Sequence, residues 1–296
     1  MASSAELRKL RRRIRSVKST QQITRAMEMI AASRIQRAQR RVEEATPYAQ
    51  MITEIIRGLA ASNEVRQHPL LAPHEQVTRV AVAVVSSDRG LAGAYNSNVL
   101  REAERVIRRE RGEGSEVELY LVGRKAVGYF RFRGAHARAS WTGFSERPQI
   151  GDAQVIAETL MDAYANGDID RVWLVFTDYK SSMVQAPNTL QILPVDPEEF
   201  AGGTSLPAEV MFEPGPETIL DRLIPRYVEA LVFAGLLESA ASEQAMRQRA
   251  MKSASENAED VVRVLSRSLN AARQAQITQE ISEIVGGAEA LRAASR

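Results

Sequence analysis

The chain has no cysteine and few histidines or aromatic residues. The lack of cysteine among its 296 residues excludes disulfides, thiol nucleophiles and cysteine-ligated metals, and it suits a reducing compartment. Only three histidines occur, at scattered positions, which argues against a zinc enzyme. Aromatic residues make up 5%, so a compact core must be mostly aliphatic. No apolar run approaches the ~20 residues of a membrane span, so we expect no direct membrane insertion.

Signatures of catalysis are also scarce. There is no G-x-x-x-x-G-K-[ST] phosphate loop. The segment SDRGLAGAYN (Ser87–Asn96) lies between a predicted strand and a predicted helix, where nucleotide-binding turns occur. However, Gly90 and Gly93 supply only part of a dinucleotide fingerprint, which needs three glycines. We therefore favour a structural turn over a ligand site, with Asp88 and Asn96 as turn and capping residues.

Other acidic residues also have an ordinary interpretation. Asp178, Tyr179 and Lys180 could form an acid–base cluster, but no His or Ser partner accompanies them, so we favour a solvated strand end. Three glutamates of the C-terminal region are predicted to form a solvated helix face: Glu243, Glu256 and Glu259. We predict no catalytic set, no cofactor and no metal site in this chain.

The charge of the chain is unevenly distributed. Its net charge is only +2. Residues 1–41 nevertheless carry twelve Lys or Arg against two acids, an excess of ten positive charges, and the remainder carries an excess of eight negative charges. A basic segment of this density requires an anionic partner, which could be a nucleic acid, a membrane surface or an acidic protein surface.

The N-terminal region has the pattern of a coiled-coil helix. Apolar residues alternate at spacings of three and four from Leu7 onward, and they include Leu10, Ile14 and Val17. Residues 4–57 would form one helix roughly 80 Å long. The apolar pattern fails at Gln21, Thr24 and Glu28, whereas Ile23, Met27 and Ile30 lie on a shifted face. This predicts a second partner near residues 23–30.

The C-terminal region repeats this pattern from Glu217 to about Leu291. The predicted seam alternates at four and three residues, and its members include Ala258, Val261, Leu265, Ser268, Ala272 and Ala275. Residues 238–260 are small and polar almost all round, which predicts a helix that either spans solvent or lies inside a sleeve of partner protein.

The middle of the chain has a different period. Three short β-branched or aliphatic runs predict buried strands: Val77–Ser86, Val117–Val122 and Arg171–Thr177. Three helical stretches alternate with them: Asn98–Arg109, Arg124–Phe132 and Asp152–Ala165. Two further edge strands are expected, at Leu190–Leu193 and Glu209–Phe212.

These elements predict an α/β fold in which an inserted Rossmann-like domain with a mainly parallel sheet separates two long terminal helices. The helices form an antiparallel coiled coil. We expect an N-terminal coiled-coil helix over residues 1–60, the globular domain over 76–213, and a C-terminal coiled-coil helix over 216–296.

Three stretches of the chain resemble the γ subunit, or central stalk, of rotary proton-translocating ATP synthases. They are IRSVKSTQQITRAMEMIAASRIQRAQ (Ile14–Gln39), SDRGLAGAYN (Ser87–Asn96), and ESAASEQAMRQRAMKSASENA with ARQAQITQEISEIVGGAEAL (Glu238–Ala258 and Ala272–Leu291). The order and spacing of the motifs agree along essentially the whole chain. The chain has neither a transit extension before the first helix nor the cysteine-bearing insertion of the chloroplast form. We therefore expect a bacterial protein without thiol regulation.

The resemblance implies a rotor shaft that couples proton flow to ATP synthesis or hydrolysis and has no catalytic site of its own. One copy would turn inside a hexamer of α and β subunits, with the globular domain against the ε subunit and the membrane c ring. The complex would lie peripherally on the cytoplasmic side of the cell membrane. The resemblance also implies contacts with β subunits, made by Lys18, Arg25, Met27, Arg273 and Gln274. It places Glu213 on the side of the rotor ring.

Two hypotheses from other classes remain at this stage. A nucleic-acid-binding coiled coil would use the basic segment on phosphates, so its affinity would fall steeply with salt. A small-molecule enzyme would use Gly90–Gly93 as its phosphate turn, so the isolated chain would bind nucleotide. The ATP synthase interpretation instead predicts co-purification with α and β partners and no nucleic acid.

Overall fold

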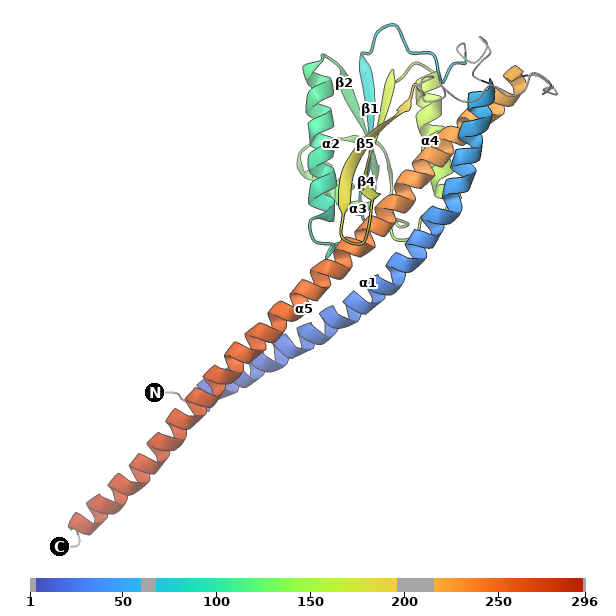
Figure 1. The fold of residues 1–296 in the computed structure, drawn as a ribbon. Helices are drawn as coiled ribbons and strands as arrows, with labels where there is room; N and C mark the ends of the chain where they lie inside the picture. The colour runs from blue at the N-terminus through green and yellow to red at the C-terminus, as the bar shows by residue number, and fades with distance from the viewer. Residues whose placement is uncertain (1–3, 60–67, 196–215, 295–296) are drawn as a thin grey trace. The chain divides into compact units, whose positions relative to one another are not determined.

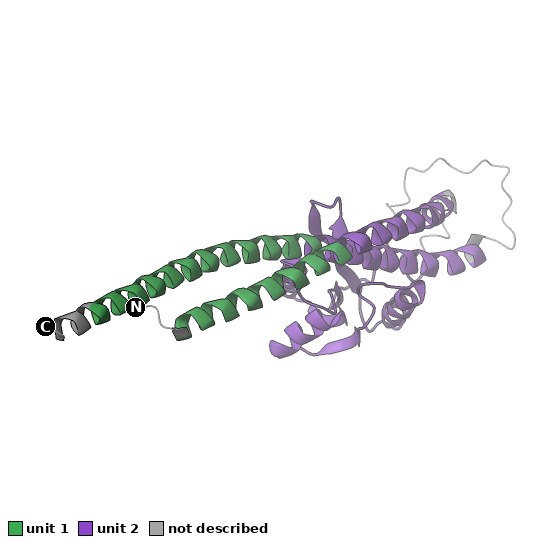
Figure 2. Ribbon diagram, turned by 90° about the horizontal axis from the view of Figure 1, so that it is seen from below, with its two compact units in different colours: residues 1–30, 248–296 green, residues 31–247 purple. Residues whose placement is uncertain are grey.

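A computed structural model describes residues 4–59, 68–195 and 216–294. Two long helices, α1 (Ser4–Leu59) and α5 (Pro216–Ala294), lie before and after a five-stranded sheet with its covering helices (Figure 1). The chain divides into two compact units (Figure 2). Unit 1 comprises residues 1–30 and 248–296, and unit 2 comprises residues 31–247. The two predicted terminal helices are confirmed, and Pro47 and Pro225 both lie inside them.

In unit 1 the two helices lie side by side and antiparallel (Figure 2). The least exposed side chains of α1 keep the predicted alternation of three and four residues: Leu7, Leu10, Ile14, Val17, Gln21 and Thr24. The seam therefore continues through its polar positions, and Thr24 is buried while its hydroxyl donates to the Gln21 carbonyl at 3.0 Å. Ile23 and Ile30 are 59% and 53% exposed, so the rest of residues 4–59, 68–195 and 216–294 leaves the shifted apolar face largely uncovered.

The seam of α5 corrects one prediction. Val261 is 42% exposed, while its neighbour Val262 is half-buried. Ala258, Leu265 and Ala272 do lie on the covered side, but the positions between them are one residue later than predicted: Val262, Leu269 and Gln276. Both registers alternate at three and four residues. The observed one places the larger side chains of Val262 and Leu269 against α1, and this buries more apolar surface than Val261 and Ser268 would.

Unit 2 is built on a mixed sheet in the order β3-β2-β1-β4-β5. Its strands are β1 (Arg79–Val85), β2 (Glu116–Val122), β3 (Ala137–Trp141), β4 (Arg171–Tyr179) and β5 (Gln185–Leu193). The first four are parallel, and β5 pairs with β4 in antiparallel orientation. The mainly parallel sheet is thus confirmed. The sequence did not predict β3, an edge strand, and Glu209–Phe212 lies outside the described residues.

Helices cover both faces of this sheet. Successive residues of β1 point to opposite faces, so Val80, Val82 and Val84 pack with α2 (Tyr95–Gly112) and α3 (Arg124–Phe132). Ala81, Ala83 and Val85 pack with α4 (Ile150–Ala165) and the first part of α5, where Ile52 and Ile56 of α1 join them. Within the described ranges, none of the helices is both long and apolar enough to cross a membrane.

Candidate functional site

Helix α5 packs against the carboxyl end of β4 through small and polar side chains. The backbone N–H of Thr177 donates to Ser239 Oγ at 3.3 Å, and Ser242 Oγ donates to the Thr177 carbonyl at 3.2 Å. One turn earlier, a Cβ on Gly235 would lie 2.9 Å from Leu174 Cδ2, so the helix approaches the sheet very closely. In open parallel sheets, ligands bind where the strand order reverses, here between β1 and β4. In this protein helix α5 itself covers the carboxyl end of β4, beside that point.

A buried arginine extends this contact to the motif Ser87–Asn96. Arg247 is 5% exposed, and its guanidinium donates to the Gly90 carbonyl at 3.2 Å and to Glu243 at 2.5 Å. Glu243 is 1% exposed, which corrects its predicted place on a solvated face; Glu256 and Glu259 are exposed as predicted. The small side chains around it, such as those of Ala240 and Ser242, allow α5 to pack closely against the sheet, and this close packing buries Glu243. Burial raises the pKa of Glu243, and the charge of Arg247 opposes that rise.

Glu146, in the loop before α4, joins a third segment to this contact. Its carboxylate lies 3.7 Å from Arg247, 3.8 Å from Arg89 and 2.5 Å from Arg34 of α1. We call Arg34, Arg89, Glu146, Glu243 and Arg247 the ionic junction. The junction joins all three motifs that carried the resemblance, because Arg34 belongs to the first, Arg89 to the second, and Glu243 and Arg247 to the third.

The segment Ser87–Asn96 is a structural turn, as predicted, but Asn96 does not cap α2, whose N-cap is Ala94 without a side-chain hydrogen bond. The carboxylate of Asp88 accepts hydrogen bonds from the backbone N–H groups of Arg124, Gly143 and Ser145, at 2.8–3.1 Å. Asn96 Oδ1 accepts from the N–H of Ser87 at 3.1 Å. Asp88 therefore ties the end of β1 to α3 and to the loop before α4. Among the described residues, no group of three or more His, Asp or Glu side chains is suited to a metal ion.

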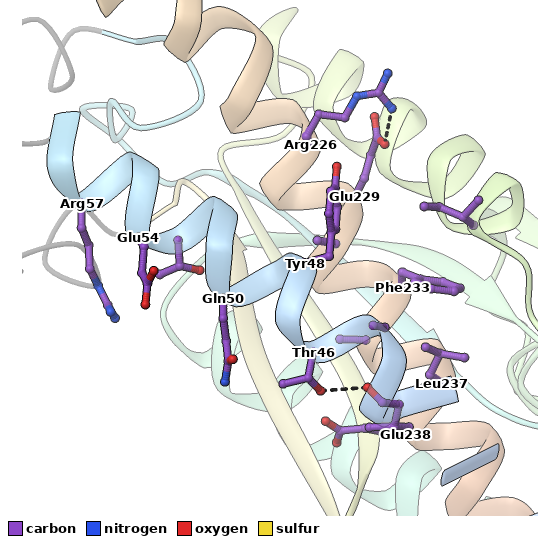
Figure 3. Close-up of a pocket in the computed structure, with 16 residues that line it drawn as sticks. Thr46, Tyr48, Gln50, Glu54, Arg57, Arg226, Glu229, Phe233, Leu237 and Glu238 are labelled. Atoms are coloured by element: carbon purple, nitrogen blue, oxygen red, sulfur yellow. Dashed lines mark hydrogen bonds and ion pairs between the residues drawn. The ribbon is translucent and has the colours of Figure 1, made fainter. Parts of the chain in front are cut away.

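Asp178 forms a carboxyl pair that the sequence did not reveal. Its partner is Glu238 of α5, a half-buried side chain that lines a cavity of about 800 Å³ between α1 and α5 of unit 2 (Figure 3). Burial and the neighbouring charge of Asp178 raise the pKa of Glu238 to about 7. Gln39 donates to the Tyr179 hydroxyl at 2.7 Å. The end of β4 is thus partly covered by both long helices rather than simply solvated.

This pair predicts a pH-dependent stability. Between pH 4.5 and about 7 the folded chain holds a proton on Glu238 that the unfolded chain releases, so stability falls as pH rises through that window. Glu238→Gln keeps the shape without the charge. After allowance for solvent screening, we expect it to raise Tm at pH 8 by about 2–4 °C, equivalent to roughly 1 kcal/mol, and to change it little at pH 4.5. Thermal unfolding across pH, with exposed Glu256→Gln as the control, measures this. Parallel curves for Glu238→Gln and the wild type would contradict it.

The residues predicted to contact partners lie on unit 1. Lys18, Arg25, Arg273 and Gln274 are exposed, and Met27 is half-buried. The ionic junction, in contrast, lies entirely in unit 2. Glu213 lies outside the described residues. The junction is therefore a site that sequence reasoning missed; its only sequence signal is a Glu and an Arg four residues apart in a run of small residues.

Comparisons with known proteins identify the family. The ATP synthase family model, ATP-synt, matches residues 6–291. An ATP synthase gamma chain from Frankia casuarinae is 50% identical over 97% of this chain and 98% of its own length. The ATP synthase gamma chain of Mycolicibacterium smegmatis is 49% identical, with the same coverage.

Solved structures agree with this result. A central stalk and c-ring structure of the Tetrahymena thermophila mitochondrial ATP synthase has a chain 25% identical to this one, with a TM-score of 0.62; the match covers 79% of this chain and 99% of that one. A chain of the Euglena gracilis mitochondrial ATP synthase has the same fold at 17% identity, with a TM-score of 0.69 over 99% and 97% of the two chains. The chain belongs to the ATP synthase γ chain family and is the central rotor stalk subunit of that complex.

Proposed function

We propose that unit 1 turns inside a ring of three α and three β subunits, with one γ chain in each ring and ATP chemistry on the β subunits. The observation that supports this most strongly is an uncovered apolar stripe near the end of α5. Ile277, Ile281, Ile284 and Val285 are 45%, 56%, 72% and 55% exposed. An apolar stripe with helical spacing that none of the described residues covers indicates a partner surface around this helix.

A single copy inside a threefold ring would drive the reaction through unequal contacts. The two helices of unit 1 carry different side chains, so each β subunit would meet a different surface. A rotor changes the conformational equilibrium of each site only through the difference in contact free energy between states. The exposed Lys18 and Arg25 of α1 provide positive charge for an acidic segment of β, next to Met27. Arg273 and Gln274, exposed on α5, would engage a second β-subunit loop.

Unit 2 would connect this rotor to the membrane sector. We infer that the α/β domain, over residues 76–213, faces the ε subunit and the c ring. The helical segments 1–60 and 216–296 would then connect the ring of α and β subunits with the c ring. As an ATP synthase subunit the chain is a peripheral part of the complex, and we place it on the cytoplasmic side of the cell membrane.

Counting subunits in the native complex tests this proposal. The complex is purified from its own cells through an affinity tag on a β subunit and measured by native mass spectrometry. The chain should be present once for every three α and three β subunits. Recovery of the chain alone, or in equal number with β, would contradict the proposed arrangement. Retention of the chain on immobilised DNA would favour the nucleic-acid hypothesis instead.

Met27→Lys tests the proposed coupling contact. A new charge beside an acidic segment would add a hydrogen bond worth about 1.5–3 kcal/mol. Rotation must break this contact at each step, so coupling between ATP hydrolysis and transport should be impaired, and ATP-driven proton pumping should slow roughly tenfold. The measurement is ATP-driven acidification of inverted membrane vesicles together with ATP hydrolysis. Met27→Leu, which keeps the volume and the apolar character, should couple normally. Unchanged coupling in Met27→Lys would remove Met27 from the proposed contact.

A further inference from the structure

Unit 2 contains an arginine-lined hollow of about 500 Å³ beside the ionic junction. Arg34, Arg37, Arg40 and Arg41 of α1 and Arg147 of the loop before α4 line it. Leu237 and Ala240 of α5 also line it, and both are buried. Charged side chains therefore surround a small space that has an apolar wall. We call this space the arginine hollow.

The positive charge of the arginine hollow is poorly compensated within the chain. Of its two carboxylates, Glu146 already lies within ion-pair distance of Arg34, Arg89 and Arg247. Among the described residues, Arg37, Arg40, Arg41 and Arg147 form no ion pair at all. Arg37 donates to Ser33 Oγ, and Arg41 donates to the Pro148 carbonyl. Glu44 is the second of the two carboxylates that line the hollow, against five arginines.

Two of these arginines come from different elements and lie close enough to repel each other. Burial lowers the pKa of Arg41, and the like charge of Arg147 lowers it further, while Glu44 acts in the opposite direction. Like charges held together are costly unless an anion lies between them. Guanidinium groups bind the oxygens of phosphates in a bidentate manner, so several of them around one hollow suit a ligand with several phosphoryl oxygens.

We propose that the arginine hollow binds a compact polyphosphate anion, either inorganic polyphosphate or the phosphate chain of a nucleotide. The volume is of the order of known small-molecule sites, which run from about 300 to 1,000 Å³. An acidic protein segment spreads its carboxylates along an extended chain, whereas a polyphosphate concentrates several negative charges in the space that the arginines surround. This site is separate from the rotor contacts proposed above, and it does not depend on them.

Calorimetric titration of the full chain at fixed ionic strength tests the site, with sodium tripolyphosphate, ATP and adenosine as the probes. We expect tripolyphosphate and ATP to bind with one-to-one stoichiometry and adenosine not to bind. Similar affinities of the two anions would show recognition of the phosphate chain alone, and tighter binding of ATP would identify a nucleotide as the ligand. Arg41→Gln/Arg147→Gln should weaken binding by at least about tenfold, because it removes charge-assisted hydrogen bonds.

The matched control is Arg11→Gln/Arg12→Gln, which removes the same charge from exposed positions of α1 in unit 1. It should leave the affinity nearly unchanged. Equal weakening in both double variants would overturn the proposal, because it would show general attraction to the basic helix. Tighter binding of a poly-glutamate peptide than of tripolyphosphate would also overturn it, in favour of an acidic protein segment. If Arg41→Gln/Arg147→Gln does not fold, the exposed pair Arg37→Gln/Arg40→Gln serves the same test.

Discussion

Replacement of Arg247 by Met should destabilise the chain by about 3–5 kcal/mol, the usual cost of removing one partner from a buried ion pair. Glu243 is 1% exposed, and Arg247 is the cation that compensates it, at 2.5 Å. Without that cation the carboxyl group must either stay charged in a buried place or take up a proton. The cost should therefore be greater at pH 8 than at pH 5, because the folded variant binds a proton that the unfolded chain releases.

Thermal unfolding of three variants separates the orphaned charge from lost packing. Glu243→Leu/Arg247→Met removes both charges and should recover most of the stability, since Glu146 keeps Arg34 and Arg89 as partners. Lys252→Met, at an exposed position of α5, serves as the control for removing a positive charge. If the double variant is no more stable than Arg247→Met alone, the loss reflects the packing of Arg247, and the buried pair has no special role.

The long helices could be predicted from apolar periodicity that extends over many turns, and the buried strands from short runs of β-branched and aliphatic residues. The expected helix over residues 4–57 is α1 (Ser4–Leu59), and the expected helix Arg124–Phe132 coincides with α3. The strand β3 could not be found in this way. Its sequence ARASW is short and has little apolar character, because an edge strand buries few of its side chains.

The ionic junction could not be predicted, because its members are far apart in the chain. Arg34 and Glu146 are separated by 112 positions, and Arg247 and Gly90 by 157. Charged side chains are normally solvated, so a single sequence gives no reason to place Glu243 inside the protein. The register of the α5 seam could not be fixed from the sequence either. Val261 and Val262 are identical neighbours that both fit a spacing of three and four residues, and only the packing of unit 1 decides between them.

Gly123→Ala should be a second strongly destabilising change. Gly123 lies at φ +90°, which an alanine adopts only with strain, at a cost of about 1–3 kcal/mol. A Cβ added there would lie 2.3 Å from the carbonyl oxygen of Ser86 and 2.7 Å from its Oγ. The backbone must therefore move, and overpacking of this kind adds about 1–3 kcal/mol. We expect a total loss of roughly 2–6 kcal/mol, measured by thermal or urea unfolding.

Gly134→Ala separates the two contributions. Gly134 also has a positive φ, of 74°, but nothing lies within 4 Å of its added Cβ, so this variant should show the conformational cost alone.

Gly123→Ala should also displace Ser86. Ser86 Oγ donates to the Val122 carbonyl and accepts from the N–H of Ala126, both at 2.9 Å. Its displacement would loosen the ends of β1 and β2 and the start of α3. Because Ser86 leads directly into the turn that contains Gly90, the Arg247 contact should weaken as well. The losses from Gly123→Ala and Arg247→Met should then be less than additive in the combined variant. Strict additivity would show that the turn and the ionic junction are independent.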